Sequence, residues 1–107
     1  MSGLSQVTDK DFDKEIINSD IPVMIDFWAD WCQPCKMLTP VIEELALKYQ
    51  GKIKIVQMNV AENPHTPARF GIRNIPALIL FRGGEVEQTI IGTYPRSRID
   101  EELEKLL

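Results

Sequence analysis

One nearly uninterrupted apolar run, residues 23–28, constrains the fold of this chain most strongly. Such a run is typical of a central strand that is buried on both faces. From Pro34 onward, apolar residues recur at the spacing of one helix face: Leu38, Val41, Ile42, Leu45, Ala46 and Tyr49. Residues 53–60 then form a second strand-like run. Two internal strands separated by a helix favour a parallel pair, and the sequence therefore predicts an α/β architecture.

Two residues mark the course of the helix between these strands. Pro40 lies inside the helical pattern and should kink the helix, because proline lacks the amide hydrogen and crowds the preceding turn. Gly51 follows the last apolar position and is the expected C-cap.

The N-terminal part predicts a further helix. Thr8 and Asp11 have the spacing of a helix start, and a short apolar stripe follows: Phe12, Ile16 and Ile17. We expect this helix to stop near residues 18–20 and a short strand at residues 4–7 to precede it. Between the second internal strand and the C-terminal part, Asn63-Pro64 and Thr66-Pro67 predict a loop with at most a short helix.

The C-terminal third predicts a hairpin and a last helix. Residues 77–81 and 86–91 are strand-like, and the pair Gly83-Gly84 suits a hairpin turn between them. Ser97 with Asp100 predicts the cap of the last helix, whose inward residues are Ile99, Leu103, Leu106 and Leu107. The expected result is a mixed sheet with an antiparallel hairpin at its edge and helices on its flanks.

Composition supports one folded domain over residues 1–107. The chain has 44% apolar and 26% charged residues, close to the globular average, and no repeat or linker divides it. The net charge of −4 disfavours nucleic-acid and anionic-membrane partners. No apolar run approaches the roughly 18 residues of a membrane span, and no secretory signal pattern is visible. We therefore expect a cytoplasmic protein, with a monomer as the default state.

The two cysteines, Cys32 and Cys35, require a chemical explanation. A disulfide across so short a loop would stabilise the fold by only roughly 2 kcal/mol. Cys32 lies where the buried strand ends and the helix begins, and free N–H groups there favour a thiolate. Pro34 suits the first helical turn, and Cys35, one turn on, should be more buried. A redox-active pair is favoured over inert thiols and over a zinc site, since zinc needs four ligands and only these cysteines and His65 are available.

Asp26 interrupts the apolar run of residues 23–28. The alternative is a carboxylate exposed to water at an edge or turn, but a strand buried on both faces disfavours it. A buried carboxylate without a cation should have a raised pKa. Such a group could exchange a proton with Cys35 near neutral pH, directly or through one water.

The segment FWADWCQPCKM, residues 27–37, resembles the active-site segment of thioredoxins. The resemblance extends over essentially the whole chain, through Pro40, residues 59–60, 63–64, 70–73, 75–76 and 78–81, Gly84 and Gly92. The string W-C-x-P-C-K with a distal I-P pair is very specific. The resemblance implies the thioredoxin fold, a mixed five-stranded sheet flanked by four helices.

The resemblance also implies a general protein-disulfide reductase that works by thiol–disulfide exchange. Cys32 would attack a substrate disulfide, Cys35 would resolve the mixed disulfide, and Asp26 would assist the deprotonation of Cys35. Apart from the redox-active Cys32–Cys35 disulfide, the resemblance implies no bound cofactor or metal. The electrons would come from an NADPH-dependent thioredoxin reductase, and the substrates would be proteins that contain disulfides.

A docking surface around the cysteines is implied as well. Pro76 matches the cis-proline that faces the cysteines in the family, and the backbone of Ile75 would pair with an extended substrate. The other matching positions are Trp31, Gln33, Pro34, Gly71, Gly84 and Gly92.

Four positions depart from the common family pattern. Gln33 replaces the glycine of the usual Gly-Pro pair, which leaves the redox potential open. Gln57 stands where a lysine is common near the buried acid, and the loss of that cation should leave the pKa of Asp26 at least as raised. Ala77 and Asn74 stand where threonine and glycine are common.

Two other functions remain open on the sequence. A binding module would use the docking surface without turnover, although the intact W-C-x-P-C-K string weighs against this as the main role. An oxidant or isomerase would carry out the same exchange at a different redox potential, which Gln33 could set.

Overall fold

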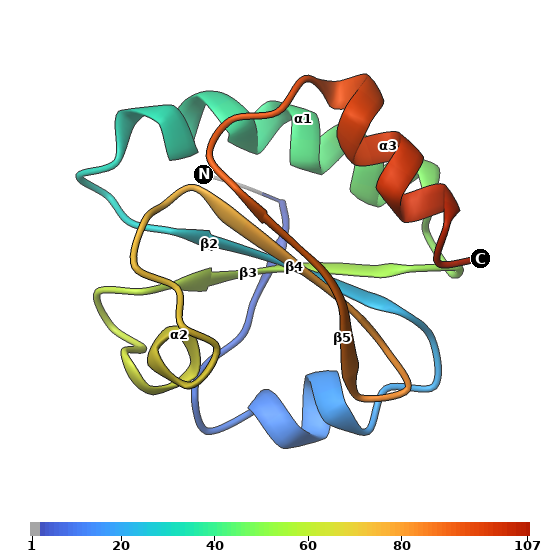
Figure 1. Ribbon diagram of the computed structural model, residues 1–107, viewed down its shortest axis with the longest axis horizontal. Helices are drawn as coiled ribbons and strands as arrows, with labels where there is room; N and C mark the ends of the chain where they lie inside the picture. Colours follow the sequence, from blue (N-terminus) through green and yellow to red (C-terminus); the bar gives the residue numbers. More distant parts are fainter. Residues whose placement is uncertain (1–2) are drawn as a thin grey trace.

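A five-stranded mixed sheet forms the centre of the computed structural model, which describes residues 3–107 (Figure 1). The strands, in chain order, are β1 (Ser5–Gln6), β2 (Val23–Trp28), β3 (Lys54–Asn59), β4 (Ala77–Arg82) and β5 (Glu85–Ile91). They lie side by side in the order β1-β3-β2-β4-β5. β3 is parallel to β1 and β2, whereas β4 is antiparallel to β2 and β5. The predicted parallel pair, the edge hairpin and the α/β class are confirmed.

Helices cover both faces of this sheet. The helices α1 (Gln33–Lys48) and α3 (Arg96–Glu104) lie on one face, and the π-helical segment η1 (Asp13–Ile17) and the short helix α2 (His65–Arg69) lie on the other (Figure 1). The structure therefore confirms the mixed five-stranded sheet with helices on its flanks, and one of those helices is a π-helix.

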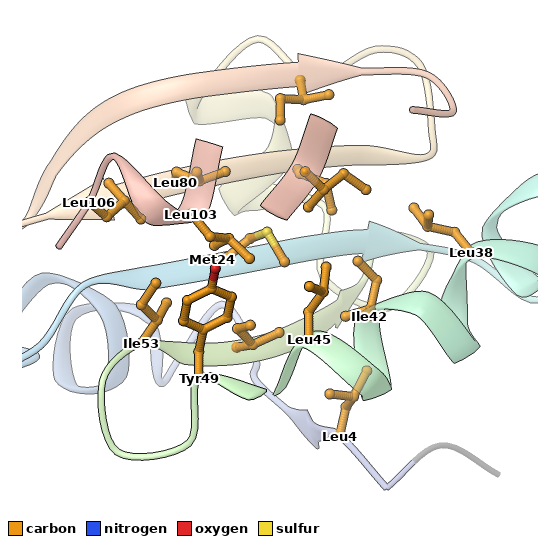
Figure 2. Packing of buried hydrophobic residues seen from close by; sticks show 14 residues of the cluster. Leu4, Met24, Leu38, Ile42, Leu45, Tyr49, Ile53, Leu80, Leu103 and Leu106 are labelled. Atoms are coloured by element: carbon orange, nitrogen blue, oxygen red, sulfur yellow. The ribbon is translucent and has the colours of Figure 1, made fainter. Parts of the chain in front are cut away.

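The side-chain alternation along β2 explains why the sheet has a core on each face. Met24 packs into the cluster beneath α1 and α3, and Figure 2 shows it beside Leu45 of α1, Tyr49 at the end of α1, and Leu103 of α3. Ile25, the next residue, packs into the opposite cluster, which contains residues of η1. Both Met24 and Ile25 are completely buried, so β2 is the doubly buried central strand that the apolar run predicts.

The first helix begins later than the sequence predicts, and its winding differs. The Asp11 backbone N–H donates to the Thr8 hydroxyl at 3.2 Å, so the expected start contact is present. Residues 9–11 nevertheless form a turn, and the regular segment that follows is a π-helix, in which the Asn18 N–H donates to the Asp13 carbonyl at 2.9 Å. An apolar spacing of four residues fits either winding, so the pattern could not distinguish them.

The last helix corrects two further predictions. Ser97 does not cap α3, because it lies inside the first turn; the N-cap position is Pro95, and no side chain caps the helix. Leu107 does not point inward and is 58% exposed. The reason is that α3 ends at Glu104, so the helical stripe does not extend to the last residue.

Two other elements end near the predicted positions but not at them. The strand expected at residues 4–7 is limited to Ser5–Gln6. The helix α1 ends with Tyr49 as its C-cap, and Gly51, the predicted cap, follows two residues later with a φ of +82°. Pro40 lies inside α1 as expected.

Candidate active site

The two cysteines lie where β2 passes into α1. Cys32 is the N-cap of α1 in extended backbone conformation, and its sulfur accepts a hydrogen bond from the Cys35 N–H at 3.2 Å. Pro34 occupies the first turn, where its missing amide hydrogen costs no helix hydrogen bond. The free N–H groups of a helix N-terminus stabilise a negative charge. A thiolate at Cys32 is therefore favoured by its position.

Cys32 and Cys35 form a disulfide in this structure, with their Cα atoms 5.3 Å apart. Cys35 is completely buried and Cys32 is 5% exposed, so Cys35 is the more buried sulfur, as expected. The pair packs with Ala29, and Trp28 and Ile75 cover it. The structure thus shows the oxidised form of a dithiol whose reactive atoms are screened by apolar side chains.

Asp26 is completely buried in the middle of β2. Its backbone lies between Gln57 of β3 and Leu78 of β4. Its Oδ2 accepts a hydrogen bond from Gln57 Nε2 at 2.9 Å, and its Oδ1 has no hydrogen-bond partner among the described residues. Burial raises the pKa of Asp26 to about 7, and the Gln57 hydrogen bond lowers it in part. The predicted raised pKa is confirmed, and the alternative of a carboxylate in water is wrong.

A polar residue that the sequence did not single out joins this site. Gln6 of β1 donates from Nε2 to Gln57 Oε1 at 2.7 Å, and its own Oε1 accepts from Trp28 Nε1 at 3.0 Å. Only the pairing of β1 with β3 places Gln6 beside Gln57. The sequence shows merely a glutamine in a short strand, so no local signal could have found it.

Several predicted docking residues lie close to the disulfide. The Ile75–Pro76 peptide bond is cis, as the resemblance implies, and Ile75 packs against the cysteine cluster. Gly92 is tied to the same loop by a hydrogen bond from its N–H to the Pro76 carbonyl at 2.9 Å. Trp31, which precedes Cys32, is 73% exposed. The first residues of α1, Gln33 and Pro34, are also exposed.

Two docking positions remain, and the structure places Gly84 away from the cysteines. Gly71 is exposed in the loop after α2, with a φ of +69°. Gly84 does not lie beside the cysteines. It belongs to the turn between β4 and β5, at the end of β4 that pairs with Val23, whereas Ala77 at the other end pairs with Phe27 near the site. The turn is distant because a strand of this length separates it from Pro76.

Within residues 3–107, no three His, Cys, Asp or Glu side chains lie together in a way that could hold a metal ion. None of the helices in that range is both long and apolar enough to cross a membrane. His65 is exposed at the start of α2.

A bonded cysteine pair at a helix N-terminus and a buried carboxyl group with a near-neutral pKa define a thiol–disulfide oxidoreductase. Residues 3–105 match the thioredoxin family model. The chain is 47% identical to thioredoxin 1 of Nostoc sp. over 107 residues, which cover all of both chains. It is 50% identical to a thioredoxin of Haemophilus influenzae over 99 residues, 92% of each chain. A thioredoxin of Porphyra purpurea is 46% identical over 104 residues, 97% of each chain.

The chain therefore belongs to the thioredoxin family. Its activity is the reduction of disulfides by thiol–disulfide exchange, and its redox-active group is the Cys32–Cys35 disulfide.

Proposed function

We propose that the chain, acting as one domain over residues 1–107, is a general reductase of protein disulfides. A monomer working in the cytoplasm would receive its electrons from an NADPH-dependent thioredoxin reductase. The observation that carries the proposal is the Cys32–Cys35 disulfide at the N-terminus of α1. A reductase must be returned to its dithiol form after each turnover, and the cytoplasm is the compartment that keeps thiols reduced.

The two cysteines have different roles in the proposed reaction. The Cys32 thiolate attacks one sulfur of the substrate disulfide, so that a mixed disulfide forms and the other substrate sulfur leaves as a thiolate. Cys35 then loses its proton and attacks the Cys32 sulfur, which releases the second substrate thiolate. Two electrons pass to the substrate, and the Cys32–Cys35 disulfide seen in the structure is the product.

Asp26 is the proposed acceptor of the Cys35 proton. Both residues are completely buried, so the thiolate of Cys35 cannot form by releasing its proton directly to bulk water. A carboxyl group with a pKa of about 7 is suited to take up and release a proton near neutral pH. Its Oδ1 is available for this proton, because Gln57 holds Oδ2.

The proposed docking surface combines exposed residues with the half-buried Ile75 and Gly92 and the buried Pro76. Trp31 offers a large exposed apolar side chain next to Cys32, and such a surface accepts many partners with little dependence on their sequence. Ile75 is proposed to pair through its backbone with an extended substrate segment. The other proposed docking residues are Gln33, Pro34, Gly71, Pro76 and Gly92.

Matched serine variants of the two cysteines test these roles. With dithiothreitol as electron donor and insulin as substrate, Cys32→Ser should abolish turnover. Cys35→Ser should form a mixed disulfide with insulin that mass spectrometry detects and that persists without dithiothreitol. Insulin reduction by Cys32→Ser at the rate of the unmodified protein would refute the mechanism and leave a binding role.

The redox potential distinguishes a reductase from an oxidant or isomerase. Trp28 packs on the disulfide and Trp31 flanks it, so tryptophan fluorescence should report its oxidation state in defined dithiol buffers. We expect a potential below that of the glutathione pool. Because about 30 mV changes the exchange equilibrium tenfold, a potential above the pool would contradict the reductase proposal clearly.

A further inference from the structure

Three strands place a row of polar side chains on one face of the sheet. Asp26 of β2 is in register with Gln57 of β3, and Gln57 is in register with Gln6 of β1. Hydrogen bonds join the row from Gln6 Nε2 to Gln57 Oε1 (2.7 Å) and from Gln57 Nε2 to Asp26 Oδ2 (2.9 Å). The indole of Trp28 closes its outer end, since Nε1 donates to Gln6 Oε1 at 3.0 Å.

The donors and acceptors of this row allow one orientation of each amide group. The indole N–H of Trp28 can only donate, so Gln6 must present its oxygen to it and turn its NH₂ group toward Gln57. The oxygen of Gln57 is thereby used by Gln6, and its NH₂ group faces Asp26. An ionised carboxylate can only accept, so this is the orientation that suits the charged form of Asp26.

We propose that Gln6 is a positioning residue, which acts through Gln57 to keep an N–H donor rather than a carbonyl oxygen against Asp26 Oδ2. Without Gln6, nothing in the row holds the Gln57 oxygen away from Asp26. A Gln57 side chain that turns its oxygen toward Asp26 would favour the protonated acid. Two oxygen atoms can form a hydrogen bond with each other only when one of them carries a proton. The pKa of Asp26 would then rise. This inference rests on the proposed function, because the pKa of Asp26 affects turnover only if Asp26 accepts the Cys35 proton.

Replacing Gln6 with an uncharged residue removes none of the charged groups near Asp26. A cavity of about 710 Å³ lies beside the row, and both Gln6 and Gln57 line it. The β4 residue that pairs with Asp26 is the apolar Leu78. The titratable groups that line this cavity are Asp30, Lys36 and Glu43. Cys32 and Cys35 at the start of α1 titrate only in the reduced protein. An uncharged replacement of Gln6 leaves all of these in place.

The test compares Gln6→Met with Ser5→Met in the full-length oxidised protein. Methionine is uncharged and similar in length to glutamine but cannot donate to Gln57 Oε1. Ser5→Met puts the same side chain on the neighbouring residue, which pairs with Val56 and therefore lies on the other face of the sheet. Both positions are exposed on the edge strand, so both variants should fold.

The readout is the pKa of Asp26, measured by ¹³C NMR of its carboxyl carbon. In the oxidised form the cysteines are bonded and do not titrate, so the curve reports the carboxyl group alone. We expect the pKa of Asp26 to rise by about half a unit or more in Gln6→Met and to stay unchanged in Ser5→Met. The pH profile of insulin reduction by Gln6→Met should shift in the same direction, toward higher pH.

Each outcome decides a different claim. An unchanged Asp26 pKa in Gln6→Met, or an equal rise in both variants, would overturn the positioning role. A rise confined to Gln6→Met supports it even when the pH profile of insulin reduction does not move. In that case the overturned claim is the proposed role of Asp26 in turnover.

Discussion

At the scale of single residues, the burial of Asp26 has a cost that the rest of the fold must offset. A carboxyl group that is completely enclosed and has one neutral hydrogen-bond donor favours its protonated form, which is why its pKa is about 7. The unfolded chain would ionise the same group near its ordinary pKa of 3.8. The two pKa values make the folding free energy depend on pH.

Replacing Asp26 with asparagine should therefore stabilise the oxidised protein more at pH 8 than at pH 4. Between the two pKa values the folded state holds a proton that the unfolded state has lost, so the stability of the unmodified protein falls as pH rises from about 4 to about 7. Asp26→Asn removes this dependence. The stability gain of the variant at pH 8 relative to pH 4 should reach about 4 kcal/mol. Urea unfolding at both pH values measures it.

The outcome that would contradict this prediction is a stability difference between the two proteins that does not vary with pH. Any cost of burying the asparagine amide is the same at both pH values and cancels in the comparison.

The sequence identified Asp26 but not Gln6, and the reason is physical. An acidic residue inside an apolar strand is anomalous by itself, because burying a charge is costly. Gln6 is an ordinary polar residue in its own segment. It acquires a role only when β1 pairs with β3 in the register that sets it beside Gln57.

At the scale of elements, the turn between β4 and β5 contacts the π-helical segment η1. Gly84 has a φ of +80°, and a Cβ atom added there would lie 3.0 Å from the backbone oxygen of Ile17. Gly83, its neighbour, has a φ of +61° and has open space where a Cβ would be. Both positions favour glycine for their backbone conformation, but only Gly84 is also needed for a close approach.

Gly84→Ala should destabilise the protein more than Gly83→Ala does. Each variant loses about 1 kcal/mol because alanine disfavours positive φ. Gly84→Ala should lose about 1–2 kcal/mol more, since η1 must move away from the turn. Thermal and urea unfolding of the two variants measure the difference. Equal stabilities would show that the contact with Ile17 does not constrain the fold.

The helices α1 and α3 are joined by Tyr49. Its ring is buried, and its hydroxyl is hydrogen-bonded to the carboxylates of Asp100 and Glu104 on α3, the latter at 2.8 Å. Burial together with these carboxylates raises the pKa of Tyr49 above its usual range. Lys48 also pairs with Asp100 and would remain as its partner if the hydroxyl were removed.

Tyr49→Phe should lower the free energy of unfolding by about 1–2 kcal/mol, because the packing is kept and only the hydrogen bonds are lost. Urea unfolding measures this. The matched control is Tyr94→Phe, since Tyr94 is only partly buried at the edge of the same cluster. A loss no larger in Tyr49→Phe than in this control would mean that the hydroxyl does not hold α3.

Errors in the predicted elements occurred where local pattern competes with neighbouring structure. Leu107 matches the spacing of an inward residue, but α3 ends three residues earlier and leaves it exposed. Ser97 is a good capping residue by type, yet Pro95 precedes it with the extended conformation that an N-cap requires.

At the scale of the whole molecule, the strand order predicts how the sheet opens. β2 lies in the centre, is paired on both sides and has a packed layer on each face, whereas β1 and β5 each have one neighbour. Opening an edge exposes less apolar surface than opening the centre.

Native-state hydrogen exchange should therefore give the slowest amides in β2 and in the parts of β3 and β4 that pair with it. These amides should exchange only by global unfolding, with a free energy equal to that from urea unfolding. The amides of β1 should exchange at a lower free energy, since that strand is two residues long. Equal protection of β1 and β2 would contradict this order.

The sequence by itself determined the buried strand, the helix that follows it, the cysteine pair between them and the anomalous carboxylate at Asp26. These features are visible in local segments of the sequence. Buried strands and helices differ in the spacing of their apolar residues, and the N-terminus of a helix lies where this spacing changes. Only the tertiary structure decided the contacts of Gln6 with Gln57 and Trp28, and the position of Gly84 at the end of the sheet away from the cysteines. Such contacts depend on strand order and register, which bring together residues that are distant in the chain.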